Sequence, residues 1–421
     1  MKSKSKPVPL KQEKMKFNPH ITIARSAEEA KQRLSRLGAD PEGIAQMEGK
    51  MRHLCVKLEK VPAEAARFLK KTMLELGAEA ALSSEVYQGK AGETDVILMG
   101  TLAQYHQLCR QIPQGPPVLS ELGQELPLLF RNFEQERFQV PLAGGETLVL
   151  GERPLIMGIV NCTPDSFYDG GRYHDPDTAV AHAQELLAAG ADIIDIGGES
   201  TRPGAEPVPS EEEKKRVIPV IERLARSTKA VISIDTQKAE VAREAVGAGA
   251  AIVNDVSALA DPAVAQAAAE SGAAVILMHM KGTPRTMQQD PSYEDLFAEI
   301  IFYLRERMDK ALQAGISRES IIVDPGIGFG KTVAHNLELV RDLWRLRSLG
   351  RPILLGPSNK SFIGKVLDAE PHERLEGTAA AIVAGILAGA HILRVHDVAG
   401  MKKYVDMAWA IKKVMNINVE K

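Results

Sequence analysis

A chain of 421 residues is too long for one ordinary domain. At about 150 residues per domain we expect two or three, although an α/β barrel alone takes about 250 residues. The composition, 44% hydrophobic and 25% charged, is globular, and the net charge of −3 with 5% aromatic residues argues against a surface built for nucleic acid.

The cysteines and the most apolar segments indicate a cytoplasmic protein. Cys55, Cys109 and Cys162 are odd in number and far apart, which excludes a disulfide framework and suits a reducing compartment. Residues 1–16 hold six lysines with no apolar stretch after them, so we expect a disordered basic tail and no secretory signal. The most apolar run, residues 378–390, is shorter than the roughly 20 residues that a membrane span needs.

Residues 17–138 have mixed patterns that are typical of a small α/β domain. Helices are expected at residues 26–37, with Ser26 as the N-cap, at 62–76 and at 102–112. Short strands are expected at residues 54–58 and 95–99. No residues in this region have the spacing of a catalytic or metal site, so its role stays open.

From about residue 139 the pattern becomes regular. A hairpin is expected over residues 140–150, around Gly144 and Gly145. Eight short runs that are apolar throughout then indicate parallel strands buried on both faces: residues 155–160, 193–196, 230–234, 251–254, 274–278, 321–323, 353–355 and 392–395. Helical segments alternate with them, at 177–189, 210–226, 239–248, 262–271, 294–314, 334–349, 373–390 and 401–414. Eight such units within residues 139–421 predict a (β/α)8 barrel, the TIM-barrel class of α/β fold.

Polar residues follow all eight predicted strands. The active site of a (β/α)8 barrel lies at the C-terminal ends of its strands. One polar residue after a strand can simply cap the next helix, but eight such ends at one mouth predict a functional site. Among them are Asn161, Asp195, Asp235, Asn254, His279, Asp324, Lys360 and Arg394.

The residue types at this mouth indicate the kind of ligand. Carboxylates and amides such as Asp235 and Asp324 suit a heterocycle with a guanidine-like edge, for example a pterin or guanine. Arg394, His396 and Lys360 are cations of the kind that hold phosphate or diphosphate. The loops after the first two strands, rich in Gly, Pro, Ser and Thr, are expected to close over bound substrates.

Two more familiar motifs are incomplete, and a third does not occur. Gly326 stands one residue too close to the Gly330-Lys331 pair for a phosphate-binding P-loop. Arg202 occupies the place of the second glycine in a nucleophile elbow. No His-Glu-x-x-His pattern occurs, which argues against a catalytic zinc.

Taken in order, the motifs resemble those of the dihydropteroate synthases. The resemblance covers roughly residues 139–421 and rests on the segments 157–167, 195–204, 234–236, 254–255, 277–279, 324–329, 360–364 and 394–397. It implies a folate-biosynthesis transferase that joins 7,8-dihydropterin-6-ylmethyl diphosphate to 4-aminobenzoate, with release of diphosphate and 7,8-dihydropteroate. It also implies a homodimer, for which helix 378–390 is a candidate contact, and no nucleic-acid or membrane partner.

The resemblance further implies roles for individual residues. The residues implied to hold or pack against the pterin ring are Asp235, Asn254, Asp324, Lys360, Met278 and Phe329. Those implied to meet the diphosphate are Arg394, His396 and Thr201, with Asn161 ligating Mg²⁺ carried by that group. Those implied to frame the 4-aminobenzoate, where sulfonamides compete, are Phe167, Pro203 and Ser361. Catalysis would also use Lys360, with Asp169 and Arg202 closing the loops.

Some positions and functions stay open. Asn359 stands where the family usually has Arg, and Cys162, where an aliphatic residue is more common, is expected to be a small buried apolar side chain. Asp195 and Asp255 could contact substrate or only hold loop backbone, and His391 is expected to be structural. The rival functions are a methyltetrahydrofolate:corrinoid methyltransferase-like protein and a non-catalytic pterin-binding module. The first rival needs neither the Ser-Thr-Arg-Pro loop nor the Arg-x-His pair, and both are intact here, which favours the synthase. Loss of Lys360, Arg394 or Asp324 would indicate the second rival, and none of them is lost.

Overall fold

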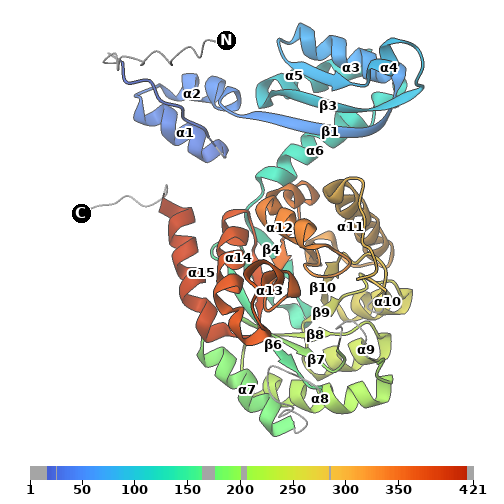
Figure 1. The fold of residues 1–421 in the computed structure, drawn as a ribbon, viewed down its shortest axis with the longest axis vertical. Helices are drawn as coiled ribbons and strands as arrows, with labels where there is room; N and C mark the ends of the chain where they lie inside the picture. Colours follow the sequence, from blue (N-terminus) through green and yellow to red (C-terminus); the bar gives the residue numbers. More distant parts are fainter. Residues whose placement is uncertain (1–16, 25, 164–175, 201–205, 284–285, 415–421) are drawn as a thin grey trace, which may run out of the picture. The chain divides into compact units, whose positions relative to one another are not determined.

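The computed structural model describes residues 17–24, 26–163, 176–200, 206–283 and 286–414 (Figure 1). The chain divides into two compact units, Met1–Pro127 and Leu128–Lys421. Helix α6 (Leu122–Glu134) runs across this division. The boundary that the sequence indicated, at residue 139, lies after this helix and stays a prediction about independent folding.

The N-terminal unit is a small α/β fold with one covered sheet face. Its antiparallel sheet has the order β1 (His53–Pro62), β3 (Glu93–Thr101), β2 (Glu79–Leu82). Along β3, Val96 and Leu98 are fully buried, whereas Ile97 is 42% exposed, because successive strand residues face opposite sides. The buried hydroxyl of Tyr105 donates to the carbonyls of Leu54 and Leu98 and so fixes helix α5 (Leu102–Gln111) to two strands.

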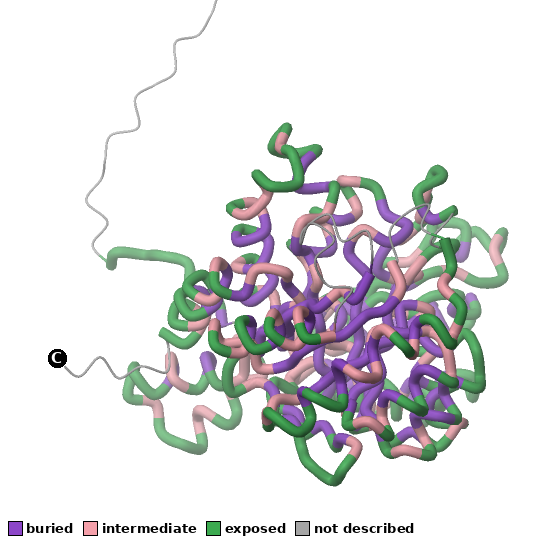
Figure 2. The backbone as a smooth tube through the Cα atoms, turned by 90° about the horizontal axis from the view of Figure 1, so that it is seen from below, coloured by how far each residue is buried: buried purple, intermediate pink, exposed green. Residues whose placement is uncertain are grey.

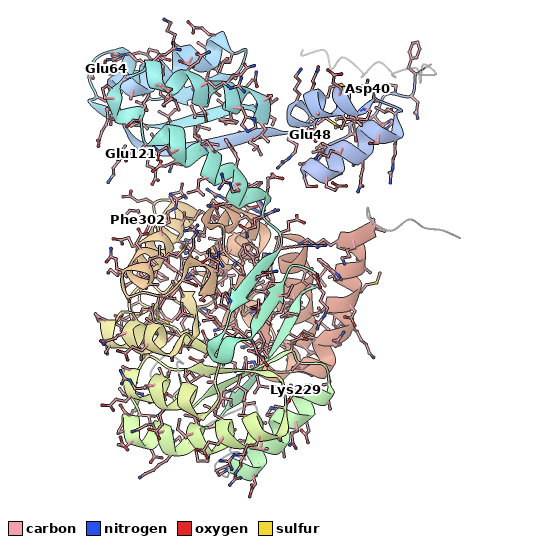
Figure 3. All side chains as sticks on the ribbon, turned by 180° about the vertical axis from the view of Figure 1, so that it is seen from behind. Asp40, Glu48, Glu64, Glu121, Lys229 and Phe302 are labelled. Carbon is pink, nitrogen blue, oxygen red and sulfur yellow. The ribbon has the colours of Figure 1, made fainter. Side chains whose placement is uncertain are left out.

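The helices of this unit follow their sequence signals in part. The predicted helices are found as α1 (Ala27–Arg36), capped by Ser26, α3 (Ala63–Glu75) and α5. Helix α2 (Pro41–Met47), helix α4 (Ser84–Tyr87) and strand β2 were not predicted. Asp40 begins α2, since its side chain accepts from the amide of Gly43 (Figure 3).

The C-terminal unit is the predicted (β/α)8 barrel. Its parallel strands are β6 (Leu155–Asn161), β7 (Ile193–Gly197), β8 (Val231–Asp235), β9 (Ile252–Asp255), β10 (Ala274–Met278), β11 (Ile321–Asp324), β12 (Leu354–Leu355) and β13 (Ile392–Val395). Strands β6 to β11 pair one with the next in sequence, β12 pairs with β13, and β13 pairs with β6. A bridge between Val323 and Ile353 joins β11 to the start of β12 and closes the ring.

Helices surround this ring (Figure 1). They are α7 (Pro176–Ala188), α8 (Ser210–Ser227), α9 (Ala239–Ala248), α10 (Pro262–Ser271), α11 (Leu296–Gln313), α12 (Val333–Arg341), α13 (Ser361–Leu367), α14 (Leu375–Leu387) and α15 (Val398–Lys413). Helix α13 was not predicted. The predicted helix 334–349 is wrong in its second half, because α12 ends at Arg341 and a 3-10 helix, Leu343–Leu349, follows. Phe302 on α11 is 62% exposed and points outward (Figure 3).

Strand alternation divides the barrel core into two clusters. Outward residues such as Ile194 and Val253 pack with the surrounding helices, whereas inward residues such as Ile193 and Ile252 pack with one another. The inward cluster also contains Val140 and Leu150 of the hairpin β4 (Phe138–Pro141) and β5 (Thr147–Leu150). The predicted hairpin therefore covers the N-terminal end of the ring and leaves the C-terminal end open for a site. Figure 2 shows the buried residues in the interior of the barrel.

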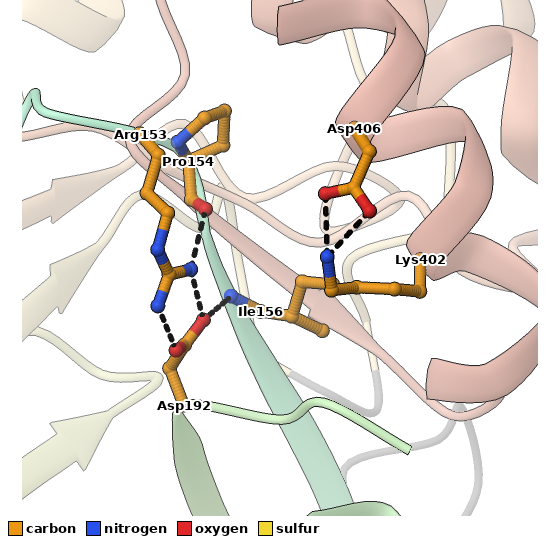
Figure 4. A network of polar contacts seen from close by, with 6 residues as sticks. All are labelled: Arg153, Pro154, Ile156, Asp192, Lys402 and Asp406. Atoms are coloured by element: carbon orange, nitrogen blue, oxygen red, sulfur yellow. Dashed lines mark hydrogen bonds and ion pairs between the residues drawn. The ribbon is translucent and has the colours of Figure 1, made fainter.

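Polar contacts also fix the N-terminal ends of the first two barrel strands. Asp192, just before β7, accepts two hydrogen bonds from Arg153, at 2.9 and 2.5 Å, and one from the amide of Ile156 at 2.9 Å (Figure 4). These bonds join the start of β7 to the start of β6. They lie at the end of the barrel opposite the strand ends discussed next.

Candidate active site

The inward positions of the barrel change from apolar to polar near the C-terminal ends of the strands. In strand register, Gly197 lies beside Asp235, Asp235 beside Asn254, and Met278 beside Asp324. Residues that pair in a parallel sheet point to the same side, so these side chains share the barrel interior. The expected mouth is therefore present.

Arg394 of β13 reaches across this interior to two carboxylates. Its Nε donates to Asp195 Oδ2 at 2.6 Å and its Nη2 to Asp235 Oδ2 at 2.7 Å. The Asp195 side chain is fully buried, and the Arg394 and Asp235 side chains are 22% and 12% exposed. The barrel thus holds a three-residue ion network, in which Arg394 neutralises two acids that the sequence separates widely.

Burial sets the ionisation of this network. It raises the pKa of Asp235 to about 7, although the Arg394 guanidinium opposes the shift. Burial acts to lower the pKa of Arg394, but Asp195 and Asp235 outweigh it and raise that pKa above its usual value. Arg394 therefore stays charged, whereas the pKa of Asp235 lies near neutral pH.

Asp195 and Asp255, left open by the sequence, have different roles. Asp195 Oδ2 accepts from Arg394 and also from Asn254 Nδ2 at 3.0 Å, so it orients two side chains of the mouth. Asp255 accepts from the amide and hydroxyl of Ser257 and from the amide of Leu259. Asp255 therefore holds loop backbone, while Asp195 supports the polar floor.

Asp324, Phe329 and Lys360 form a second part of the mouth. Asp324 is buried, and burial raises its pKa against the opposing effects of the Gly326 amide and Lys360. Phe329 packs in a small apolar cluster with Met278, Val256 and Met287. The Lys360 ammonium lies 4.1 Å from the centroid of the Phe329 ring, a cation–π contact. A carboxylate, an apolar wall and a cation thus come together, as the sequence predicted.

The remaining predicted residues that the structure describes lie at strand ends or in the segments that follow them. Asn161 is the last residue of β6 and lies beside Gly197 in the register. His396 comes directly after β13, and its Nδ1 lies 3.0 Å from the hydroxyl of Ser358. Ser361 is the first residue of α13. Asn359, which stands where the family usually has Arg, has φ +58°. Its backbone amide donates to the hydroxyl of Thr378 on α14.

Five predicted site residues lie outside the described residues: Phe167, Asp169, Thr201, Arg202 and Pro203. Two predicted structural residues are as expected. Cys162 is buried, and burial raises the pKa of its thiol to about 12, so it is a small apolar group. His391 is buried and accepts from the amide of Ile353, and burial lowers its pKa to about 3.

Two polar clusters beside the mouth were not predicted as functional. In one, Lys238 donates to Glu199 and to the fully buried Glu213, and Glu199 also accepts from the amide of Val208 at 3.1 Å. In the other, the buried Lys331 contacts His279. Their residues are far apart in the sequence, and no spacing signal relates them.

A barrel with this mouth matches known proteins. Residues 157–396 match the family described as pterin binding enzyme. The dihydropteroate synthase of Escherichia coli (strain K12) is 50% identical over 256 residues, which cover 61% of this chain and 90% of that protein. A solved dihydropteroate synthase of Xanthomonas albilineans with 4-aminobenzoic acid is 47% identical, with a TM-score of 0.60, and the match covers 65% of this chain and 98% of that one. The chain therefore belongs to the dihydropteroate synthases within the pterin-binding enzymes.

One further relative extends beyond the barrel. A probable bifunctional folylpolyglutamate synthase/dihydropteroate synthase of Halobacterium salinarum is 43% identical over 377 residues. The match covers 90% of this chain and 45% of that protein. Because the barrel unit begins only at Leu128, the match includes part of the N-terminal unit. The additional unit therefore has a counterpart in another protein.

Proposed function

We propose that this chain condenses 7,8-dihydropterin-6-ylmethyl diphosphate with 4-aminobenzoate to give 7,8-dihydropteroate and diphosphate. One observation carries the proposal beyond family membership. Acids and amides converge inside the C-terminal end of the barrel with a buried arginine, next to an apolar wall. Such a mouth offers acceptors to a flat heterocycle and a cation to its diphosphate. The family membership and this mouth favour the synthase over a corrinoid-dependent methyltransferase.

Asp235, Asn254 and Asp324 are proposed to bind the pterin ring. Carboxylates accept from the amino and ring N–H groups of a guanidine-like edge, and such charge-assisted bonds are strong in a buried site. The burial of Asp324 and Asn254 supports this role. Met278 and Phe329 would cover a face of the ring, and Lys360 beside Phe329 would donate to a ring acceptor.

Arg394 and His396 are proposed to bind the diphosphate, with Thr201 as a further contact. Arg394 already has two carboxylate partners, which hold the guanidinium in place before substrate arrives. His396 follows the last residue of β13, two positions after Arg394, and its Nδ1 lies 3.0 Å from the Ser358 hydroxyl. Both cations would stabilise the negative charge that develops as the leaving group departs.

Mg²⁺ is proposed to enter with the diphosphate. Among the described residues no group of three or more His, Cys, Asp or Glu side chains could hold a metal ion. Asn161 at the end of β6 offers one amide oxygen, which fits a Mg²⁺ whose other ligands are phosphate oxygens and waters. The ion would neutralise charge on the departing diphosphate.

The proposed reaction breaks the bond between the pterin methylene carbon and a diphosphate oxygen. Aromatic amines are weak nucleophiles, so departure of diphosphate has to supply most of the activation. The amine nitrogen of 4-aminobenzoate then forms the new C–N bond and loses a proton. Ser361 at the start of α13, with Phe167 and Pro203, is proposed to frame this second substrate.

A homodimer in the cytoplasm is proposed on less direct grounds. Tyr404, Met407 and Ile411 of α15 are 42%, 62% and 48% exposed, and their spacing of three and four residues puts them on one face of the helix. The helix expected to make the contact, α14, buries Ala379, Ala381, Ile382 and Ile386 but leaves Leu387 exposed. Light scattering should give twice the chain mass of 45.7 kDa, and substituting lysine for Met407 should lower it. A wild-type monomer at micromolar concentration would exclude the dimer.

No helix among the described residues combines the length and apolar character needed to span a membrane. The exposed free thiol of Cys55 is compatible with a reducing compartment.

The test is an assay of diphosphate release with the full chain. Release should require both the dihydropterin diphosphate and 4-aminobenzoate, should stop when Mg²⁺ is removed with a chelator, and should be inhibited by a sulfonamide in competition with 4-aminobenzoate. The variant Asp235→Ala should lose release, whereas Glu270→Ala, on the exterior of helix α10, should retain it. Release that is independent of 4-aminobenzoate would contradict the proposed reaction.

A further inference from the structure

Lys331 is a buried lysine with uncharged hydrogen-bond acceptors. It is 3% exposed, and its Nζ lies 2.9 Å from His279 Nδ1. It also donates to the carbonyls of His279 at 3.3 Å and Phe329 at 2.9 Å. When Lys331 is protonated it has only donors, so Nδ1 of His279 then accepts and the other ring nitrogen carries the proton.

The loop between Asp324 and Lys331 contains one backbone hydrogen bond, from the amide of Phe329 to the carbonyl of Gly326, and is otherwise held by side chains. The Gly326 amide donates to Asp324, and the Gly328 amide donates to Asn336 Oδ1 at 2.7 Å. Tyr293 donates to the Gly330 carbonyl at 2.7 Å. Together with the Lys331 bond to the Phe329 carbonyl, these contacts fix the loop residue by residue.

Close backbone approach brings this loop onto the segment after β10. Gly326 has φ +69°, and a Cβ there would lie 1.9 Å from the carbonyl oxygen of His279. Gly330 has φ +63°, and a Cβ there would lie 2.4 Å from the carbonyl oxygen of Lys281. Only glycine fits at these two positions, and Lys331 bonds to the same segment through His279.

The loop positions two residues of the proposed pterin site. Phe329 forms part of the apolar wall with Met278. Lys360 lies over the Phe329 ring, and a Cβ on Gly328 would lie 3.0 Å from Lys360 Cδ. A displaced loop would therefore move the wall and the cation together.

We propose that Lys331 is a positioning residue for the pterin site: by joining the Phe329 carbonyl to His279, its side-chain nitrogen fixes the loop on which Phe329 and Lys360 depend. This inference rests on the proposed function, because it assumes that the wall binds a pterin. Burial lowers the pKa of His279 to about 2, so its ring is neutral and keeps the acceptor that Lys331 needs. Lys331, the lysine of the segment that resembles a P-loop, is thus proposed to fix a loop and not to bind phosphate.

The test compares variants of the full chain in the binding of 6-hydroxymethylpterin, measured by calorimetry. Lys331→Met keeps a side chain of similar length but removes every donor, and should weaken binding about tenfold. His279→Leu removes the ring acceptor and should also weaken binding, whereas His279→Asn offers an amide oxygen near the place of Nδ1 and should stay within about twofold of wild type. This pair of His279 variants tests the inference even if Lys331→Met does not fold.

A merely structural role would predict different results. Asp192→Ala, at the opposite end of the barrel, serves as a control for general destabilisation, since it removes the contacts to Arg153 and Ile156. It should lower the urea midpoint without changing pterin affinity, and it should leave kcat unchanged. In contrast, Lys331→Met should raise KM for the dihydropterin diphosphate more than it lowers kcat.

Three outcomes would overturn the inference. Lys331→Met could bind 6-hydroxymethylpterin as wild type does, His279→Asn could be as weak as His279→Leu, or Asp192→Ala could weaken binding as much as Lys331→Met. Each of these, with an active wild-type chain, leaves the proposed function intact. A wild-type chain that neither binds the pterin nor releases diphosphate would refute the proposed function and the inference with it.

Discussion

The ion network around Arg394 predicts a large effect of one substitution on stability. Arg394→Met keeps much of the side-chain volume but leaves Asp195 and Asp235 buried without their cation. Removing one partner of a buried ion pair costs about 3–5 kcal/mol. We expect the free energy of unfolding to fall by that amount at pH 8.5, which lies above the pKa of about 7 to which burial raises Asp235.

The loss should become smaller as the pH falls. Burial already raises the pKa of Asp235 to about 7 against the effect of Arg394, so removal of the guanidinium should raise it further. A carboxyl group whose pKa is higher in the folded state than in the unfolded state binds a proton more tightly in the folded protein. Its protonation therefore stabilises the fold as the pH falls from the folded pKa toward the unfolded value near 4. One proton contributes about 1.4 kcal/mol per pH unit. Relative to wild type, we expect about 1–2 kcal/mol to return between pH 8.5 and pH 6.5.

Urea unfolding followed by circular dichroism at both pH values measures this effect. The triple variant Arg394→Met/Asp195→Asn/Asp235→Asn has no buried charge to compensate, so it should regain most of the stability but none of the activity. Arg153→Met is the matched control, because that arginine side chain is 53% exposed and its ion pair with Asp192 should contribute at most about 1 kcal/mol. A loss below about 1 kcal/mol for Arg394→Met, or one that does not depend on pH, would refute the reasoning.

Three further predictions concern the site, the buried lysine and the domain boundary. Asp324→Asn removes the charge facing the pterin edge, so kcat/KM for the dihydropterin diphosphate should fall by the equivalent of at least about 2–3 kcal/mol, and an unchanged value would contradict that contact. Burial lowers the pKa of Lys331 to about 7, below its unfolded value near 10.4, so the unfolded state binds more protons above pH 7 and the free energy of unfolding should rise with pH. Urea unfolding at pH 7 and at pH 9 should show a rise about 2 kcal/mol larger in wild type than in Lys331→Met. Equal rises in the two proteins would count against the burial of a charge. A shortened chain that begins at Gln139 lacks Asn132, which donates to the Ser348 carbonyl. This chain should catalyse the reaction, but its free energy of unfolding should be about 1–3 kcal/mol lower than that of a chain that begins at Leu122. Equal stability of the two chains would place the domain boundary at residue 139.

Most barrel strands could be predicted because they are buried on both faces. Such strands are continuous apolar runs, and the bounds of β10 and β13 agree with the prediction residue for residue. Helix breaks were harder. The segment 334–349 contains no glycine or proline, so nothing in its pattern indicates the change from α12 to a 3-10 helix near Asp342. Helix α13 has only seven residues, too few for a periodic signal.

The site could be predicted in position but not in its contacts. Polar residues at strand ends identified the mouth, because all eight strands of a barrel end on the same side. The pattern does not say which side chains meet. The bonds of Arg394 to Asp195 and Asp235 span residues far apart in the sequence and depend on where each strand lies in the ring. The contact of Lys331 with His279 likewise depends on how the glycine loop lies against the segment after β10.

The strands that carry the polar mouth also carry the apolar cluster below it. At four of the polar positions the residue two places earlier, on the same side of the strand, is apolar: Ile193 precedes Asp195, Ile252 precedes Asn254, Ile322 precedes Asp324, and Ile392 precedes Arg394. Because these pairs share a backbone, a change in the packing of the isoleucines would shift the carboxylates and the guanidinium above them. The mouth can be buried because its charges neutralise one another, and it stays aligned because the apolar cluster holds each strand in place. Core substitutions at these isoleucines should therefore affect substrate binding together with stability, whereas outward positions such as Ile194 should affect stability alone.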